Sequence, residues 1–284
     1  MSQTARDRIC LVTGATSGIG RATAQALAAM GSTTVLVARD PAKGETTANE
    51  IRRATSNDRV EVRIADLSSQ ASIRTLAGAF GQSHDRLDVL VNCAGAFFRT
   101  RRTTVDGIEM TFALNHLAYF LVTTLLLDRL RSSPSARILN VTAPATTKVD
   151  VDDLQGERRY RPFTAFGASK VENLMFTFEL ARRLEGTQIT VNAVHPGRVR
   201  SNLMHEAPAP FRALTKLVSG SPVRAGAAIA QLATAPEYAG KTGRLYHDGG
   251  GIEAPARSGD EGLRRRLWEM SEQLTRGGSE ASAS

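Results

Sequence analysis

A glycine-rich stretch near the N-terminus, residues 13–20, has the residue types and the spacing that a phosphate site needs. It follows the apolar run 9–12 and precedes a helical pattern over 21–30. In a strand, glycine loop and helix, backbone N–H groups and the positive helix end face an anion, which the missing Cβ atoms let approach. An ordinary strand–helix turn stays an alternative here, because three glycines alone are weak evidence. The expected cradle residues are Gly14, Thr16, Ser17, Gly18, Ile19 and Gly20.

The end of the next apolar run, residues 33–38, favours a phosphorylated dinucleotide. In dinucleotide folds an acidic residue about 20 positions beyond the glycine loop binds the ribose 2′-hydroxyl, whereas an arginine there accommodates a 2′-phosphate. Position 38 is alanine and Arg39 follows it. Arg39 could instead be a surface charge at a strand end, but the missing carboxylate beside an arginine favours NADPH as the cofactor.

Two further strand-like runs end in residues suited to the same ligand. Asp66 and Leu67 follow the run 60–65, and the Asp66 carboxylate is expected to reach the adenine amine. The run 87–91 leads into Asn92, Cys93, Ala94 and Gly95, whose small side chains let a cofactor pass close to the backbone. We expect Asp66, Leu67, Asn92, Ala94 and Gly95 to contact the cofactor.

The alternation of strand-like and helical patterns predicts an α/β fold, a doubly wound Rossmann-type parallel sheet of about seven strands with helices on both faces. The expected strands are residues 9–12, 33–38, 60–65, 87–91, 137–142, 189–194 and 244–246. Residues 106–131 and 164–184 predict the longest helices. We expect one domain over 1–252 with a substrate lid at 201–221, then a C-terminal extension over 253–284 that ends in disordered residues. The ligand crevice should lie at the carboxyl ends of the strands.

Composition narrows the class of protein. No apolar run reaches the roughly 20 residues that a membrane span needs, so a cytoplasmic protein without a membrane partner is expected. The net charge is +8, but the basic residues are scattered and have no interleaved aromatics, which argues against nucleic acid. Cys10 and Cys93 lie in apolar runs and are expected in the core, and no metal site is predicted.

Several of these motifs, found in register between residues 8 and 250, together resemble the short-chain dehydrogenase/reductase superfamily. They are residues 13–20, residues 92–95, Asn115, Lys170 and residues 195–197. The segments 154–157, 169–184 and 191–197 resemble the retinol dehydrogenase branch in particular. This resemblance implies an NADP cofactor and carbonyl or alcohol chemistry. It also implies cofactor contacts from Lys170, Pro196, Gly197, Val199 and Ser201.

The resemblance implies a catalytic set of Asn, Ser, Tyr and Lys, which is incomplete in this chain. Asn115 and Lys170 occupy two of the four positions, but the tyrosine position is Phe166 and the serine position is Ala143. Phe166 cannot transfer a proton, and the Ala143 side chain cannot donate a hydrogen bond. Thr142 is a poor substitute, since adjacent strand residues face opposite sides. Losing a general acid costs roughly 10²- to 10⁴-fold in rate.

The favoured hypothesis is an NADPH-dependent ketoreductase whose aromatic ketone substrate supplies the missing proton. A ketone beside a phenolic hydroxyl, as in aromatic polyketides, has an internal hydrogen bond that polarises the carbonyl and can protonate the alkoxide. Because it lacks this tyrosine, the chain resembles the angucyclinone ketoreductases of antibiotic biosynthesis, which are atypical members of the superfamily. Ala143, Phe166 and Met204 are expected to line the substrate pocket.

Two other functions and two structural questions stay open. A non-catalytic NADPH-binding sensor or assembly protein needs no acid, and neither does a reductase of C=C or C=N bonds. Tyr160, in the charged loop 149–161, could swing into the site, although a packing or lid role is simpler. The apolar helices at 106–131 and 164–184 suit either the core or the interface of a homo-oligomer.

Overall fold

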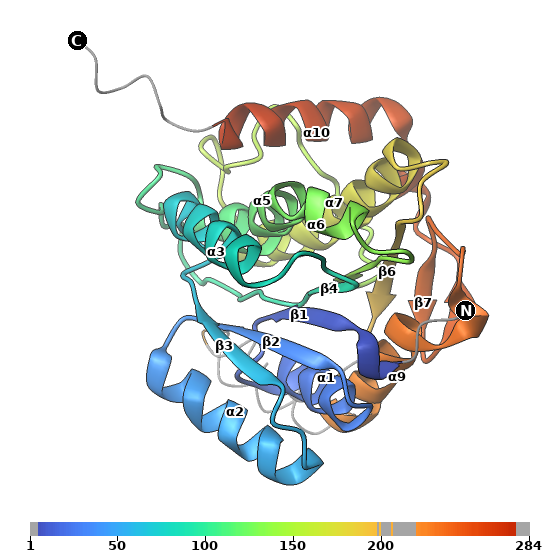
Figure 1. The fold of residues 1–284 in the computed structure, drawn as a ribbon. Helices are drawn as coiled ribbons and strands as arrows, with labels where there is room; N and C mark the ends of the chain where they lie inside the picture. The colour runs from blue at the N-terminus through green and yellow to red at the C-terminus, as the bar shows by residue number, and fades with distance from the viewer. Residues whose placement is uncertain (1–4, 198, 200–205, 207–219, 277–284) are drawn as a thin grey trace.

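The computed structural model describes residues 5–197, 199, 206 and 220–276. Its centre is one sheet of eight strands in the order β3-β2-β1-β4-β5-β6-β7-β8 (Figure 1). Every neighbouring pair is parallel except β7 and β8. The strands are β1 (Ile9–Thr13), β2 (Thr33–Ala38), β3 (Val60–Ile64), β4 (Val89–Asn92), β5 (Arg137–Val141), β6 (Thr190–His195), β7 (Leu245–His247) and β8 (Gly250–Ile252).

Helices cover both faces of the sheet, as a doubly wound fold requires. One face carries α1 (Gly18–Ala29), α2 (Pro41–Thr55) and α9 (Pro222–Thr234). The other carries α3 (Gln70–Ser83), α4 (Met110–Phe112), the π-helix η2 (Ala113–Leu117), α5 (Ala118–Leu125), α6 (Leu127–Arg131) and α7 (Pro162–Arg183), with α10 (Glu261–Thr275) outermost (Figure 1). Short 3₁₀ turns are η1 (Ala5–Asp7), η4 (Pro236–Tyr238) and η5 (Ala256–Gly259).

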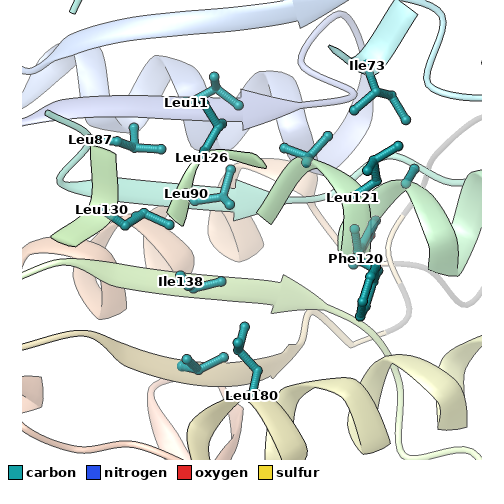
Figure 2. Close-up of a cluster of buried hydrophobic side chains, with 14 of the residues drawn as sticks. Leu11, Ile73, Leu87, Leu90, Phe120, Leu121, Leu126, Leu130, Ile138 and Leu180 are labelled. Carbon is teal, nitrogen blue, oxygen red and sulfur yellow. The ribbon is translucent and has the colours of Figure 1, made fainter. Parts of the chain in front are cut away.

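Alternation along the central strands divides the core into two layers. Leu11 of β1 packs with the α3, α5 and α7 side (Figure 2), whereas its neighbours Cys10 and Val12 pack with the α1, α2 and α9 side. All three are fully buried, because successive strand side chains point to opposite faces and both faces are covered. The doubly wound prediction is therefore confirmed, with eight strands in place of about seven.

The additional strand β8 follows a two-residue turn that the sequence reading missed. Asp248 and Gly249 have φ values of 47° and 81°, and His247 pairs antiparallel with Gly250. Asp-Gly is a strong signal for such a hairpin, since both central residues need positive φ. Two glycines in β8 concealed the strand, because glycine has a low strand propensity.

The long helix expected over 106–131 is interrupted in the structure. Residues 105–107 form a turn in which Gly107 has a φ of 75°, and the helical segment begins only at Met110. The Glu109 carboxylate caps this start by accepting from the N–H groups of Thr111 and Phe112, each at 2.8 Å. A π-helical turn over 113–117 then separates α4 from α5. Such turns often mark functional sites.

Helix α10 packs onto the core. Trp268 packs against Phe120 and Phe176, with ring centroids 4.9 Å and 5.9 Å away, and the Arg183 guanidinium lies 4.2 Å from its ring centroid. This helix thus covers part of the apolar surface of α5 and α7 that a homo-oligomer could have used. Whether the protein forms a homo-oligomer stays a prediction. In the part of the chain that the structure describes, no helix has the length and apolar character needed to span a membrane.

Close packing of α1 against α9 depends on Gly226, which leads to a test of the fold. A Cβ at this position would lie 2.5 Å from the carbonyl carbon of Ala22 and 2.6 Å from the backbone nitrogen of Thr23. Gly226→Ala should lower the free energy of unfolding by about 1–3 kcal/mol in urea titrations, because the helices must move apart. In the control Gly78→Ala in α3, where no atom lies within 4 Å, stability should rise by about 0.5–1 kcal/mol. Equal effects of both variants would contradict this packing.

Candidate active site

The glycine loop between β1 and α1 forms a cradle that side chains would fill. Gly14 has a φ of 64°, and a Cβ there would lie 2.9 Å from the Cα of Ala94. A Cβ on Gly20 would lie 2.4 Å from the Gly14 carbonyl oxygen. The loop therefore requires glycine at both positions, because neighbouring backbone atoms occupy the space that a Cβ would take.

The cradle is fixed to the end of the neighbouring strand β4. The Thr13 hydroxyl accepts hydrogen bonds from the backbone N–H groups of Cys93 (2.9 Å) and Ala94 (3.1 Å). Ser17 is the N-cap of α1, and its side chain makes no capping hydrogen bond. The first N–H groups of this helix thus face the loop without a side-chain cap, which fits an anion such as a dinucleotide pyrophosphate.

The adenosine end of the predicted site lies along the next two strands. Arg39 is exposed directly after β2, beside the end of β1, and Asp66 follows β3 at the same edge of the sheet. One Asp66 carboxylate oxygen accepts from the N–H (2.9 Å) and hydroxyl (2.7 Å) of Ser68, which orients the group. The Leu67 side chain is buried in the core, so only its backbone can face a cofactor.

The Asn92 side chain has a structural role inside the protein. Its side chain is fully buried, and its amide donates to the hydroxyl of Thr123 (3.0 Å) and to Oδ1 of Asn140 (2.9 Å). The amide therefore joins β4 to α5 and β5 inside the protein. Strand alternation turns this side chain toward Thr123 and Asn140, and the predicted cofactor contact at position 92, which passes close to the backbone, stays a prediction.

The part of the cofactor site that binds the nicotinamide was predicted around residues 196–204. Gly197 follows β6 with a φ of 75°, and a Cβ there would lie 3.2 Å from Cε1 of His247. Val199 forms an isolated bridge with Gly220. Ser201 and Met204 lie outside the described residues, as does the predicted lid except for residues 206, 220 and 221.

Asn115 and Lys170, the two predicted catalytic residues, are brought together beside Gly95. A Cβ on Gly95 would lie 3.2 Å from Oδ1 of Asn115 and 3.7 Å from Nζ of Lys170. Asn115 also holds the loop after β4: its Oδ1 accepts from the Ala96 N–H (2.9 Å) and its Nδ2 donates to the Ala96 carbonyl (3.0 Å). The same Nδ2 donates to the hydroxyl of Ser169 in α7 at 3.1 Å.

The Lys170 ammonium is buried and lies over an aromatic ring. Burial lowers its pKa to about 8, although Cys93 and Glu172 act in the opposite direction. Its Nζ is 5.3 Å from the centroid of the Phe166 ring, one helical turn earlier in α7. At neutral pH the side chain is therefore mainly the cation, available to bind hydroxyl groups of a ligand.

No proton-donating side chain occupies the position expected for the acid. Phe166 packs edge-on against the fully buried Phe97, with ring centroids 6.0 Å apart. Ala143 lies just beyond β5, and the hydroxyl of its neighbour Thr142 donates to the Lys170 carbonyl at 2.7 Å. The Thr142 hydroxyl is thus committed to the backbone of α7.

Tyr160 is held by its own partners. Its hydroxyl lies 3.1 Å from the Thr111 hydroxyl and donates to the Phe98 carbonyl at 3.2 Å. Burial raises its pKa, which makes it a weaker acid. These contacts favour the packing role over the catalytic one.

The sequence reading missed a buried carboxyl group near Lys170. Glu172 is 3% exposed, and its Oε2 has no hydrogen-bond partner in the described part of the chain. Burial raises its pKa to about 8, Glu109 acts in the same direction, and Lys170 opposes them. The signal available in the sequence was an acidic residue within the apolar helix face that includes Val171 and Met175.

Both cysteines are free, as their positions in the strand-like runs predicted. Burial raises the pKa of each thiol to about 12, so neither is a reactive thiolate at neutral pH. Within the described ranges, no three His, Cys, Asp or Glu side chains are grouped as metal ligands would be.

Comparison with known families and sequences agrees with this arrangement. The chain matches the short chain dehydrogenase family over residues 8–210. It is 39% identical to retinol dehydrogenase 14 of Homo sapiens over 283 residues, which cover 92% of this chain and 84% of that protein. It is 41% identical to retinol dehydrogenase 13 of Homo sapiens over 276 residues, which cover 93% and 83%.

Two solved structures share the fold at about 30% identity. A putative uncharacterized protein from Mycobacterium paratuberculosis has a TM-score of 0.76 and 31% identity, with 97% of this chain and 98% of that chain covered. The RhlG/NADP active-site complex from Pseudomonas aeruginosa has a TM-score of 0.70 and 30% identity, with 87% and 97% covered.

The buried Glu172 predicts an unusual dependence of stability on pH. Its pKa is about 8 in the fold and near the ordinary value of 4.5 when unfolded, so the folded state binds the extra proton between these values. Stability should therefore fall as pH rises through this window. From about pH 5 to 8, the wild type should lose on the order of 3–4 kcal/mol more than Glu172→Gln in urea titrations.

Glu179→Gln in the same helix is the matched control for this measurement. Glu179 is 1% exposed but is paired with Arg182 and Arg183, and hydrogen bonds to these arginines lower its pKa. This variant should therefore keep the wild-type slope between about pH 5 and 8. A wild-type slope in Glu172→Gln as well would show that Glu172 ionises normally.

Proposed function

Because the chain belongs to the short-chain dehydrogenase/reductase family, we propose that this oxidoreductase is an NADPH-dependent ketoreductase acting on an aromatic polyketide. The proposed substrate is a ketone of the angucyclinone type, reduced in antibiotic biosynthesis. The observation that carries the proposal is Phe166 at the position of the acid, packed against Phe97 beside the retained Lys170. The proton must then come from elsewhere.

The cofactor half of the proposal rests on the cradle and on Arg39. The loop with Gly14 and Gly20 fits a pyrophosphate, and the exposed Arg39 follows β2 where a 2′-phosphate is expected. The similar RhlG protein of Pseudomonas aeruginosa was solved with NADP. When bound, NADPH supplies the hydride.

The retained polar residues have roles that need no tyrosine. We assign the Lys170 ammonium to the hydroxyls of the nicotinamide ribose, for which its burial and cationic state suit it. Asn115 fixes the backbone at Ala96, so the small residues after β4 keep their place beside the cofactor. Phe166 and Ala143 present apolar surface to the substrate and exclude water from the reacting carbon.

A neighbouring phenol completes the proton balance. Hydride addition to the carbonyl carbon breaks the C=O π bond and leaves an alkoxide, which takes the proton of the hydrogen-bonded phenol. The resulting phenolate, the conjugate base of an acid with a pKa near 10, is reprotonated by water. The phenol thus does what a tyrosine side chain does, and it arrives already hydrogen-bonded to the reacting oxygen.

The first test compares a phenol-flanked polycyclic ketone with its O-methyl ether. Methylation removes the proton and the internal hydrogen bond, so kcat for NADPH oxidation should fall by roughly 10²-fold or more. The matched control carries the methyl group on a phenol remote from the ketone and should react like the parent. Reduction of the neighbouring methyl ether at the parent rate would refute substrate assistance, and a C=C or C=N product would refute ketone reduction.

The second test returns a hydroxyl to the acid position. Phe166→Tyr should change kcat for the phenol-flanked ketone by less than about three-fold, because a second acid adds little when the first is in place. Protein melting temperature and NADPH affinity serve as controls for folding. A large rise in kcat would mean that proton donation limits the natural reaction. Phe166→Tyr with Ala143→Ser shows separately whether generic ketones become substrates.

A further inference from the structure

A chain of hydrogen bonds joins the C-terminal helix to the backbone of Asn115. The hydroxyl of Ser271 in α10 lies 3.0 Å from Nε2 of His116, in η2. Nδ1 of the same ring lies 3.3 Å from Oδ1 of Asn173, in α7. Nδ2 of Asn173 donates to the main-chain carbonyl of Asn115 at 2.8 Å. Three elements distant in sequence thus meet at one peptide group.

The bond from Asn173 to the Asn115 carbonyl determines which atoms donate in the other hydrogen bonds of this series. The Asn115 carbonyl only accepts, so the Asn173 amide must present Nδ2 to it and Oδ1 to His116. Oδ1 also only accepts, so the proton of a neutral His116 must be on Nδ1. Nε2 is then the acceptor, so the single proton of the Ser271 hydroxyl is shared between Nε2, 3.0 Å away, and the Leu267 carbonyl, to which this hydroxyl donates at 2.8 Å.

His116 is neutral under ordinary conditions. It is 1% exposed, its ring stacks on Phe112 at 5.2 Å between centroids, and burial lowers its pKa to about 4. The gap that it shares with Ser271 has no room for a water molecule. The hydrogen bond to Asn173 acts in the opposite direction on this pKa but is the smaller effect.

We propose that Ser271, His116 and Asn173 are positioning residues for Asn115, which makes α10 part of the active-site scaffold. The proposal rests on the role assigned to Asn115 in the proposed function. Asn115 lies in the π-helical turn, where the α-helical hydrogen-bond pattern changes, and its carbonyl accepts a hydrogen bond from outside this segment. Asn173 supplies the donor. The chain from α10 then sets the rotation of the peptide whose side chain holds Ala96 and Ser169.

Docking of α10 is strong enough to act as an anchor. The Trp268 ring packs between Phe120 and the Arg183 guanidinium, on the same side as Ser271 one turn later. The far end is held where Nε2 of Gln70 in α3 donates to the Leu274 carbonyl at 2.8 Å. A hydroxyl carried by this helix therefore has a fixed position relative to His116.

The tautomer of His116 is the test that needs no substrate. Long-range ¹H–¹⁵N spectra of the full chain, with the resonance assigned by His116→Gln, should show the neutral Nδ1–H form from about pH 5 to 8. An Nε2–H tautomer would leave Nδ1 without a proton to donate to Asn173. Titration of His116 near pH 6.5 would show that the ring is not held in the neutral form. Either result overturns the proposal even if ketone reduction is confirmed, and neither depends on the substrate.

Kinetic variants test whether the chain positions Asn115 for catalysis. With the phenol-flanked ketone, Ser271→Ala should lower kcat roughly three- to ten-fold and change the KM for NADPH less than two-fold, because it removes one hydrogen bond that orients the site. Ser271→Thr keeps a hydroxyl and should retain kcat. Asn173→Asp replaces the donor with an acceptor and should lower kcat further.

Ser258→Ala is the matched control for loss of a buried hydroxyl. Ser258 is fully buried in the same C-terminal segment, and its hydroxyl donates to the Pro255 carbonyl at 2.6 Å. It should lose stability as Ser271→Ala does and keep its kcat. Equal kcat values for Ser271→Ala and the wild type would overturn the proposal. If no ketone is reduced by the wild type, the proposed function fails, whereas the ¹³C shift of the Asn115 carbonyl in Ser271→Ala still reports on the chain.

Discussion

Contact between the glycine loop and the end of β4 is the constraint on which the site depends. Gly14 lies so close to Ala94 that no Cβ fits between them, and the Thr13 hydroxyl binds the same segment. The residues after Ala94 then meet Asn115, and Asn115 in turn meets α7 beside Lys170. One continuous path of backbone and side-chain contacts thus sets the predicted cofactor cradle and the predicted catalytic residues relative to each other.

This path explains how the acid can be absent without loss of the site. No contact along it involves a side chain at position 166 or 143. Phe166 instead packs on Phe97 and offers its ring face to the Lys170 ammonium, an interaction that favours the cation by about 0.5–2 kcal/mol. Under the proposed function, the ring at position 166 therefore leaves the arrangement that would hold the hydride donor unchanged.

How far the sequence predicts the structure depends on the range of the interactions. Alternating apolar runs and glycine loops act locally, so the central strands and the cradle were predicted with boundaries within a few residues of the observed ones. The buried hydrogen bonds of the Asn92 side chain could not be predicted, because its partners Thr123 and Asn140 are distant in the chain and only the folded sheet shows which face this side chain takes. The helix that Glu109 caps begins later than expected, because residues 105–107 form a turn before it.

His116 shows the same limit at the site itself. Nothing in the sequence around His116 indicated its role, because its partners Asn173 and Ser271 lie 57 and 155 positions away. Phe166 and Ala143, in contrast, were singled out from the sequence by the family resemblance, since Phe166 lies four residues before Lys170 and Ala143 directly follows Thr142. What the structure adds is that Thr142 and Tyr160 have partners of their own, so neither is placed as a substitute acid.

An enzyme that relies on a proton from its substrate selects substrates by chemistry as well as by shape. Under the proposed function, a ketone without the neighbouring phenol can bind beside the same Phe166 and Ala143, but its alkoxide has no acid nearby and its reduction carries the full cost of that absence, roughly 3–5 kcal/mol. A tyrosine at position 166 would serve both ketones equally and remove this discrimination. Specificity of this kind arises in the reaction step rather than in binding, because the missing proton raises the energy of the transition state and not that of the bound substrate.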